Sequence, residues 1–102
     1  MAHETMHESL ESLTPETLDI HRAISSLMEE FEAVDWYQQR ADACKDKELK
    51  KVLEHNRDEE IEHAAMVLEW LRRKMPRLDK ELREYLFSEG SITGREAESH
   101  EG

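Results

Sequence analysis

The sequence has few of the residues that make turns. It contains three glycines and two prolines in 102 residues. Folds built from β-strands need frequent turns, and these two residue types supply many of them. The scarcity of glycine and proline therefore predicts an all-α protein with long helices.

Cysteine and long apolar runs are also scarce. Cys44 is the single cysteine, which excludes an intrachain disulfide and fits a reducing compartment. No segment approaches the roughly 20 apolar residues of a membrane-spanning helix. The first residues lack the basic and apolar regions of a signal peptide. We therefore expect a cytoplasmic protein that does not cross a membrane.

Positive charge is the third shortage. Lysine and arginine number 14 against 25 acidic residues, which gives a formal net charge of -11. An acidic surface repels nucleic acids and anionic membranes, and it attracts cations. We expect metal ions as ligands, and neither nucleic acid nor a membrane as partner.

Helix boundaries can be placed from capping residues. Thr14, followed by proline and an acidic residue, predicts a helix start, and the helical pattern continues to about Cys44. Asp46 is a suitable cap for a second helix that runs from about Lys47 to Lys74. Two long helices with so short a link must fold back as an antiparallel hairpin.

A shorter third helix is expected after Pro76, which ends the second helix. Its apolar positions share one face, and Gly90 is the expected stop; they are Leu78, Leu82, Tyr85 and Leu86. With 37% hydrophobic residues, the chain has a small core. We therefore expect this helix to pack against a neighbouring subunit. The predicted organisation is a flexible arm at 1–13, a helical domain at 14–90 and a flexible tail at 91–102.

Charged residues interrupt the apolar stripe of each long helix. The first stripe steps by three and four residues through Ile20, Ala23, Leu27, Glu30, Val34, Tyr37 and Ala41. The second follows Leu49, Leu53, Asn56, Glu60, His63, Val67 and Trp70. The turn lies midway between Glu30 and Glu60, so folding the hairpin brings Glu30 level with Glu60 and close to His63.

A carboxylate on such a stripe needs a partner. Burying one unpaired costs on the order of several kcal/mol, and a metal cation would remove that cost. Residues three apart lie on one face of a helix, so the Glu60-x-x-His63 pair can reach one point. An interhelical salt-bridge cluster with a protonated histidine is the alternative explanation.

The chain carries half of a known ligand set. Four-helix di-iron carboxylate proteins use one Glu from each of two helices and a Glu-x-x-His from each of the other two. A two-fold dimer of this hairpin would form a ferritin-like four-helix bundle and complete the set. Carboxylate and imidazole ligands suit iron, manganese or zinc. Iron is the expected metal, with two ions per subunit dimer.

These segments carry a family resemblance. Residues 28–37 (MEEFEAVDWY) and 55–64 (HNRDEEIEHA), followed by 68–73 (LEWLRR) and 85–87 (YLF), are similar to the encapsulated ferritins. The resemblance covers roughly residues 14–93. It implies a ferroxidase centre formed across a dimer interface and an annular decamer of five dimers. It also implies residence inside an encapsulin shell, which stores the iron.

The resemblance further implies residue roles. It makes Glu30, Glu60 and His63 the di-iron ligands, with Trp36 and Tyr37 beside the centre. It suggests an acidic site for incoming metal at Glu29 and Glu32, and an outer metal site at His55, Glu59 and Glu62. Solvated surface charge explains both of these acidic groups equally well, and packing is a simpler role for the two aromatic residues. The cargo-loading peptide common in the family has no apolar and basic counterpart before Gly102.

Two other functions use similar features. A non-catalytic acidic helical protein that only oligomerises would bind no metal. A hemerythrin-like or rubrerythrin-like di-iron protein would act on oxygen or peroxide. However, hemerythrins need more histidines along their helices, and rubrerythrins need paired Cys-x-x-Cys sites that this sequence lacks. Catalysed oxidation of ferrous iron without an organic substrate separates a ferroxidase from these alternatives.

Overall fold

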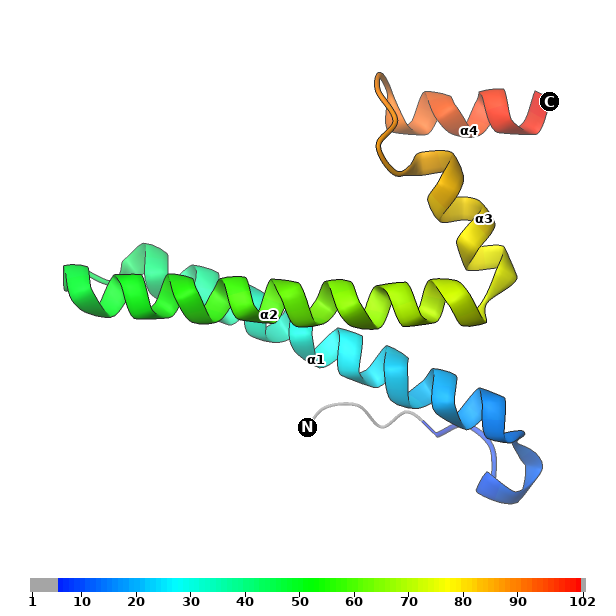
Figure 1. Cartoon of the computed structure of the whole chain (residues 1–102), viewed down its shortest axis with the longest axis horizontal. Coiled ribbons are helices and arrows are strands. Elements are labelled where there is room, and N and C mark those ends of the chain that lie inside the picture. The colour runs from blue at the N-terminus through cyan, green and yellow to red at the C-terminus, as the bar shows by residue number, and fades with distance from the viewer. Residues whose placement is uncertain (1–5, 102) are drawn as a thin grey trace.

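The fold is an antiparallel helical hairpin that carries a short helical arm (Figure 1). A computed structural model describes residues 6–101. Its elements are the 3-10 turn η1 (Leu10–Ser12) and the helices α1 (Pro15–Ala43), α2 (Lys47–Lys74), α3 (Pro76–Tyr85) and α4 (Ile92–Glu101). The described residues contain no strand, which confirms the all-α prediction.

Both long helices begin at the predicted caps. The Thr14 hydroxyl accepts a hydrogen bond from the backbone N–H of Thr17 at 3.1 Å. The Asp46 carboxylate accepts one from the N–H of Leu49 at 2.9 Å. Each bond satisfies one of the N–H groups that a first helical turn leaves without a partner. The short link from Cys44 to Asp46 then forces α2 back along α1.

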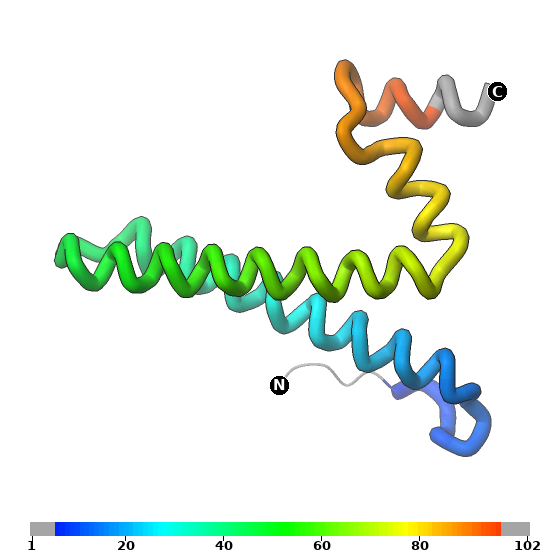
Figure 2. Tube along the Cα trace, viewed as in Figure 1, coloured from blue at the N-terminus to red at the C-terminus, as the bar shows by residue number. Residues whose placement is uncertain are grey.

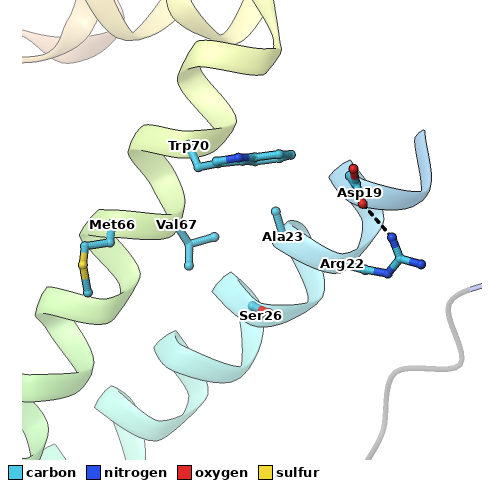
Figure 3. A pocket seen from close by; sticks show the side chains of 7 residues that line it. All are labelled: Asp19, Arg22, Ala23, Ser26, Met66, Val67 and Trp70. Carbon is cyan, nitrogen blue, oxygen red and sulfur yellow. Dashed lines mark hydrogen bonds and ion pairs between the residues drawn. The ribbon is translucent and has the colours of Figure 1, made fainter. Parts of the chain in front are cut away.

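The hairpin is closed at its turn and more open at its other end. Figures 1 and 2 show α1 and α2 crossing, with their ends opposite the turn spread apart. At this open end, a cavity of about 400 Å³ lies between the helices (Figure 3). Ala23 on α1 and Val67 and Trp70 on α2 are among its lining residues. One hairpin therefore leaves part of its apolar seam accessible.

The fully buried core is small. Among the described residues, it consists of Ala41, Ala64 and Leu71, each 2% exposed. Many larger apolar side chains stay partly exposed, as expected for a chain that must cover them by association.

Four of the exposed apolar side chains lie on one side of the hairpin, beside the seam. Ile24, Met28 and Phe31 stand at i, i+4 and i+7 on α1, and all three are exposed, as is Ile61 on α2. Phe31 directly follows the seam residue Glu30, and Ile61 directly follows Glu60. In two antiparallel right-handed helices, the residues that follow seam positions point to the same side. We call this set, Ile24, Met28, Phe31 and Ile61, the apolar face.

Ion pairs set the direction of α3. At the elbow after Lys74, the Arg72 guanidinium donates to both carboxylate oxygens of Glu69 at 2.7 and 2.8 Å and also pairs with Asp79. Arg83 donates to the same Asp79 carboxylate at 2.9 Å. Bidentate arginine–carboxylate pairs fix geometry as well as adding energy. Arg72 therefore links the end of α2 to the first turn of α3, and α3 projects from the hairpin (Figure 1).

The C-terminal part of the chain differs from the sequence prediction in two respects. Helix α3 ends at Tyr85, so the expected stop at Gly90 was wrong. The chain turns at Phe87, whose φ of 61° is in the left-handed region. Helix α4 occupies the segment predicted to be a flexible tail. At the start of α4, the Ser91 hydroxyl accepts a hydrogen bond from the backbone N–H of Gly94 at 3.0 Å. The Arg95 side chain donates a hydrogen bond to the backbone carbonyl oxygen of Glu84 in α3 at 3.0 Å.

The predicted division into arm, domain and tail otherwise stays a prediction. Residues 1–5 of the arm lie outside the described residues, and the rest of the arm includes the turn η1. Within the part of the chain that is described, no helix combines the length and apolar character needed to cross a membrane.

The elbow should respond to acid. The pKa of Glu69 is lowered from 4.5 to about 2, mainly by the hydrogen bonds from Arg72 and, to a smaller extent, by the hydrogen bond from Arg73. A carboxylate with a lowered pKa contributes stability above its unfolded-state pKa, and this contribution is lost as the pH falls toward the folded-state pKa. We expect the melting temperature of wild type to fall between about pH 4.5 and about pH 2. The fall should be shallower in Glu69→Gln, as followed by circular dichroism. Identical pH profiles for the two proteins would contradict this assignment.

Candidate metal centre

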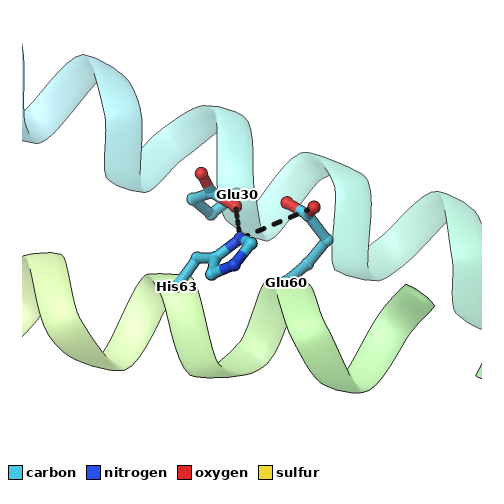
Figure 4. Close-up of side chains that lie close together, drawn as sticks. All are labelled: Glu30, Glu60 and His63. Atoms are coloured by element: carbon cyan, nitrogen blue, oxygen red, sulfur yellow. Dashed lines mark ion pairs between the residues drawn. The ribbon is translucent and has the colours of Figure 1, made fainter. Parts of the chain in front are cut away.

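The three predicted ligands meet at the seam of the hairpin. Glu30 comes from α1, and Glu60 and His63 come from α2 (Figure 4). The Nδ1 atom of His63 lies 3.5 Å from Oε2 of Glu30 and 3.8 Å from Oε1 of Glu60. One potential ligand atom from each residue lies within 4.8 Å of the other two. Among the described residues, this is the one group of three or more acidic, histidine or cysteine side chains so placed.

The side chains of the cluster are partly exposed to solvent. The side chains of Glu30 and Glu60 are 24% and 25% exposed, and that of His63 is 45% exposed. The Oε2 atom of Glu30 is buried and has no hydrogen-bond partner. A carboxylate oxygen in this position has lost water without gaining a donor, which is costly.

The two carboxylates of the cluster disfavour each other's charged form. Hydrogen bonding with the Glu60 carboxyl, burial and the charge of Glu60 raise the pKa of Glu30, while His63 acts in the opposite direction. The pKa is raised because the charged form of Glu30 is disfavoured beside a second carboxylate. A cation at this point would favour the charged form of both.

The donor set fits a divalent or trivalent metal ion. Ligand atoms at about 2.1 Å from one ion lie roughly 3 Å apart, so the observed separations need only a small contraction. Two carboxylates and one imidazole suit iron, manganese or zinc. Oε2 of Glu30 has an ion-pair contact with His63 but no hydrogen bond, so its lone pairs are available to a cation.

The two aromatic residues predicted to flank the centre lie farther along α1. Trp36 is exposed and Tyr37 is half-buried. The guanidinium carbon of Arg40 lies 6.0 Å from the ring centroid of Trp36 and 5.5 Å from that of Tyr37. This distance range allows a cation–π interaction with each ring. Arg40 was not singled out from the sequence, although its i+3 and i+4 spacing from the two rings could have indicated the contact.

Two of the three residues predicted to form an outer site lie close to each other. Nε2 of His55 lies 3.4 Å from Oε1 of Glu59. Glu62 is exposed and does not join them in a three-residue cluster. Glu59 and Glu62 directly precede the seam residues Glu60 and His63, so they point to the side opposite the apolar face.

The pair predicted to receive incoming metal is not gathered into a cluster either. Glu29 is exposed and Glu32 is half-buried. Glu29 directly precedes Glu30, so it shares the side of the hairpin that carries Glu59 and Glu62. We call these residues the acidic face: Glu29, His55, Glu59 and Glu62, with the exposed apolar residues Val52 and Met66 that also directly precede seam positions.

One further contact holds the two helices beside the centre. Arg57 on α2 donates to the side-chain oxygen of Gln38 on α1 at 2.8 Å, and its own side chain is 24% exposed. Arg57 precedes Glu60 by one turn, so this bond braces the hairpin next to the ligands. Sequence reasoning missed it because the two residues are 19 positions apart and no periodic pattern connects them.

Fold and site together define a class. A helical hairpin with one Glu on the first helix and a Glu-x-x-His on the second is half of a ferritin-like carboxylate bundle. Comparison with known proteins makes the assignment more specific. The sequence model of the EncFtn-like family matches residues 5–89, and the chain belongs to this family.

Individual relatives agree with that assignment. The encapsulated ferritin-like protein of Rhodospirillum rubrum is 63% identical over 91 residues, which make up 89% of this chain and 65% of that protein. A ferritin-like protein of Thermotoga maritima is 55% identical over 96 residues, covering 94% of this chain and 84% of that protein. The chain thus spans slightly less than two thirds of the first relative. A crystal structure of a Nitrosomonas europaea protein superposes with a TM-score of 0.84 at 61% identity, covering 87% of this chain and 98% of the other.

Removing one of the opposed charges should separate stability from metal binding. Glu30→Gln relieves the repulsion of Glu60, so the metal-free protein should melt at a higher temperature than wild type. The same change removes a ligand, so affinity for Zn²⁺ or Mn²⁺ should fall at least about tenfold. Calorimetric titration and thermal unfolding by circular dichroism measure the two effects.

Asp42→Asn is a matched control, because it removes one exposed carboxylate near the turn. It should leave metal affinity close to that of wild type. Wild-type metal affinity in Glu30→Gln would rule out Glu30 as a ligand.

Proposed function

We propose that this protein is a ferroxidase, which oxidises Fe(II) to Fe(III) at a di-iron site formed between two subunits. The observation that carries the proposal is the cluster of Glu30, Glu60 and His63, in which a buried carboxylate oxygen of Glu30 has no hydrogen-bond partner. Membership of a ferritin-like family supports iron as the metal. The ferric product is destined for storage.

Completion of the site requires a second copy of the chain. One subunit offers three ligand residues, whereas a pair of ions in a carboxylate bundle uses four glutamates and two histidines. The apolar face beside the cluster, with Phe31 53% exposed and Ile61 46% exposed, is the surface that a two-fold partner would cover. Burial of such a face is favourable by about 25 cal/mol per Å² of apolar surface. The homodimer is thus the unit that forms the site, and an annular decamer is the proposed assembly.

The chemistry follows from placing two ferrous ions under shared carboxylates. Each Fe(II) gives up one electron, and dioxygen accepts the pair. The glutamates contribute by neutralising the rise in charge from Fe(II) to Fe(III), and His63 supplies a neutral ligand. Exclusion of water by the dimer interface would strengthen each of these interactions.

Other residues have proposed supporting roles. Trp36 and Tyr37 are suited to supply or relay electrons, since both are oxidisable aromatic side chains on the helix that carries Glu30. Glu29 and Glu32 would receive incoming metal, while His55, Glu59 and Glu62 would form an outer site. The position of these acidic residues on or beside the acidic face supports their roles, because a surface of negative charge attracts cations.

The proposed location is the cytoplasm, inside an encapsulin nanocompartment. This part of the proposal draws support from the Rhodospirillum rubrum relative, which is named an encapsulated ferritin-like protein. An open ring of helical hairpins encloses no storage cavity of its own, so an encapsulin shell protein is the proposed partner. The shell would retain the ferric iron.

Ferrous oxidation by ligand variants tests the chemistry. Glu30→Ala, Glu60→Ala and His63→Ala should each lower the rate of Fe(III) appearance by at least about a hundredfold, since each change removes a metal ligand. The rate is followed optically under air with ferrous salt as the only substrate. Asp19→Ala, which removes an exposed carboxylate about three turns of α1 before Glu30, is the control. Wild-type rates in all three ligand variants would exclude the proposed centre.

The requirement for two subunits has its own test. Phe31→Arg places a charge on the apolar face, and a change at an interface hot spot weakens association by about 2 kcal/mol, or about thirtyfold. Native mass spectrometry should then show monomer where wild type is dimeric or larger. The rate of ferrous oxidation by Phe31→Arg should be lower than that of wild type, and it should recover as the protein concentration is raised, because dimers then form again.

Val52→Arg is the matched control, because Val52 is similarly exposed but precedes the seam residue Leu53 and so points to the acidic face. It should leave both assembly and oxidation intact. Full activity in a strictly monomeric Phe31→Arg protein would contradict a shared site.

A further inference from the structure

Met66 is an exposed methionine close to the centre. Its side chain is 59% exposed, and it lies in α2 three residues after His63. Three residues of helix correspond to about 4.5 Å along the axis. Figure 3 shows the Met66 side chain directed away from α1, whereas Val67 and Trp70 point toward it. The thioether is therefore outside the seam but within one turn of a ligand.

The position of Met66 keeps it accessible after dimerisation. Met66 directly precedes the seam residue Val67, so it belongs to the acidic face, one turn beyond Glu62. Two open cavities of about 400 and 460 Å³ include it in their lining, and Glu62 lines the second. In the proposed dimer, the second copy covers the apolar face and would leave this side of the hairpin free.

We infer that Met66 is a modification site, at which hydrogen peroxide released from the metal centre oxidises the thioether to methionine sulfoxide. This inference rests on the proposed ferroxidase activity, because two ferrous ions reduce dioxygen by two electrons and, with two protons, yield hydrogen peroxide. The sulfur then attacks one peroxide oxygen, the O–O bond breaks, and water leaves. Sulfur is oxidised by two electrons, and the peroxide is reduced by the same two.

The neighbouring side chains explain why a thioether at this place is useful. Trp70 lines the same two cavities as Met66, and its indole helps to fill the open end of the seam. Methionine oxidation is reversible by reductases, and at Met66 it alters a side chain that is largely exposed. Met66 would thus consume peroxide before it reaches the tryptophan.

The chain supplies its own comparison residues. Met28 is 42% exposed in one subunit, but it lies on the apolar face that the second copy covers. Met75 is half-buried at the elbow. Since oxidation of methionine follows exposure, the assembled protein should show Met66 well ahead of both.

The experiment uses the whole chain and mass spectrometry of its proteolytic peptides. In one arm, hydrogen peroxide is added without iron; in the other, ferrous salt is added under air. In both, Met66 should gain one oxygen atom roughly tenfold faster than Met28 or Met75. Met66→Leu should leave more free peroxide during iron oxidation and raise Trp70 oxidation, while Met75→Leu should change neither.

The two arms separate this inference from the ferroxidase proposal. Equal oxidation of Met66 and Met28 by added peroxide would overturn the inference, whatever the iron chemistry. Rapid iron oxidation with Met66 unmodified would do the same and leave the ferroxidase intact. Absence of iron oxidation, with Met66 still the first residue oxidised by added peroxide, would instead count against the ferroxidase.

Discussion

Two carboxylates of like charge face each other across the seam of the hairpin, where packing favours apolar side chains. Glu30 and Glu60 repel each other, and part of Glu30 has lost its contact with water without gaining a donor. Fold stability alone would favour leucine at both positions. The proposed cation would explain their presence, and the rest of the structure can be understood as the frame that holds them at this spacing. The caps at Thr14 and Asp46, the short turn and the Arg57–Gln38 bond all fix α1 against α2 near this point.

Helical geometry divides the hairpin into two sides that differ in chemistry. The residues of the apolar face all follow seam positions, and the residues of the acidic face all precede them. One side is therefore suited to another copy of the chain, and the other to solvent and cations. The cluster of Glu30, Glu60 and His63 lies on the boundary between the two sides, which suits the proposed site, completed by a second subunit and supplied with metal from solvent.

Much of this arrangement could be predicted from the sequence, because long helices have a regular period. The period of 3.6 residues placed Glu30, Glu60 and His63 on facing stripes, and the short link set their height. The less regular parts were not predictable in the same way. The early end of α3 depends on a left-handed turn at Phe87 rather than at a glycine, and α4 depends on single contacts of Ser91 and Arg95. The Arg57–Gln38 bond and the separation of Glu62 from His55 and Glu59 depend on side-chain rotamers, which spacing does not determine.

The link between Cys44 and Asp46 has a consequence for how such a protein can evolve. Surface loops normally tolerate insertions and deletions. Here a single added residue that extended either helix would rotate the following positions by about 100° and separate Glu30 from its two partners. Length variation should therefore be confined to the chain termini and to the region after Lys74, where additions leave the spacing between positions 30 and 63 unchanged. The length of this link, which contributes no predicted ligand, thus restricts which insertions and deletions the protein can accept in evolution or in engineering.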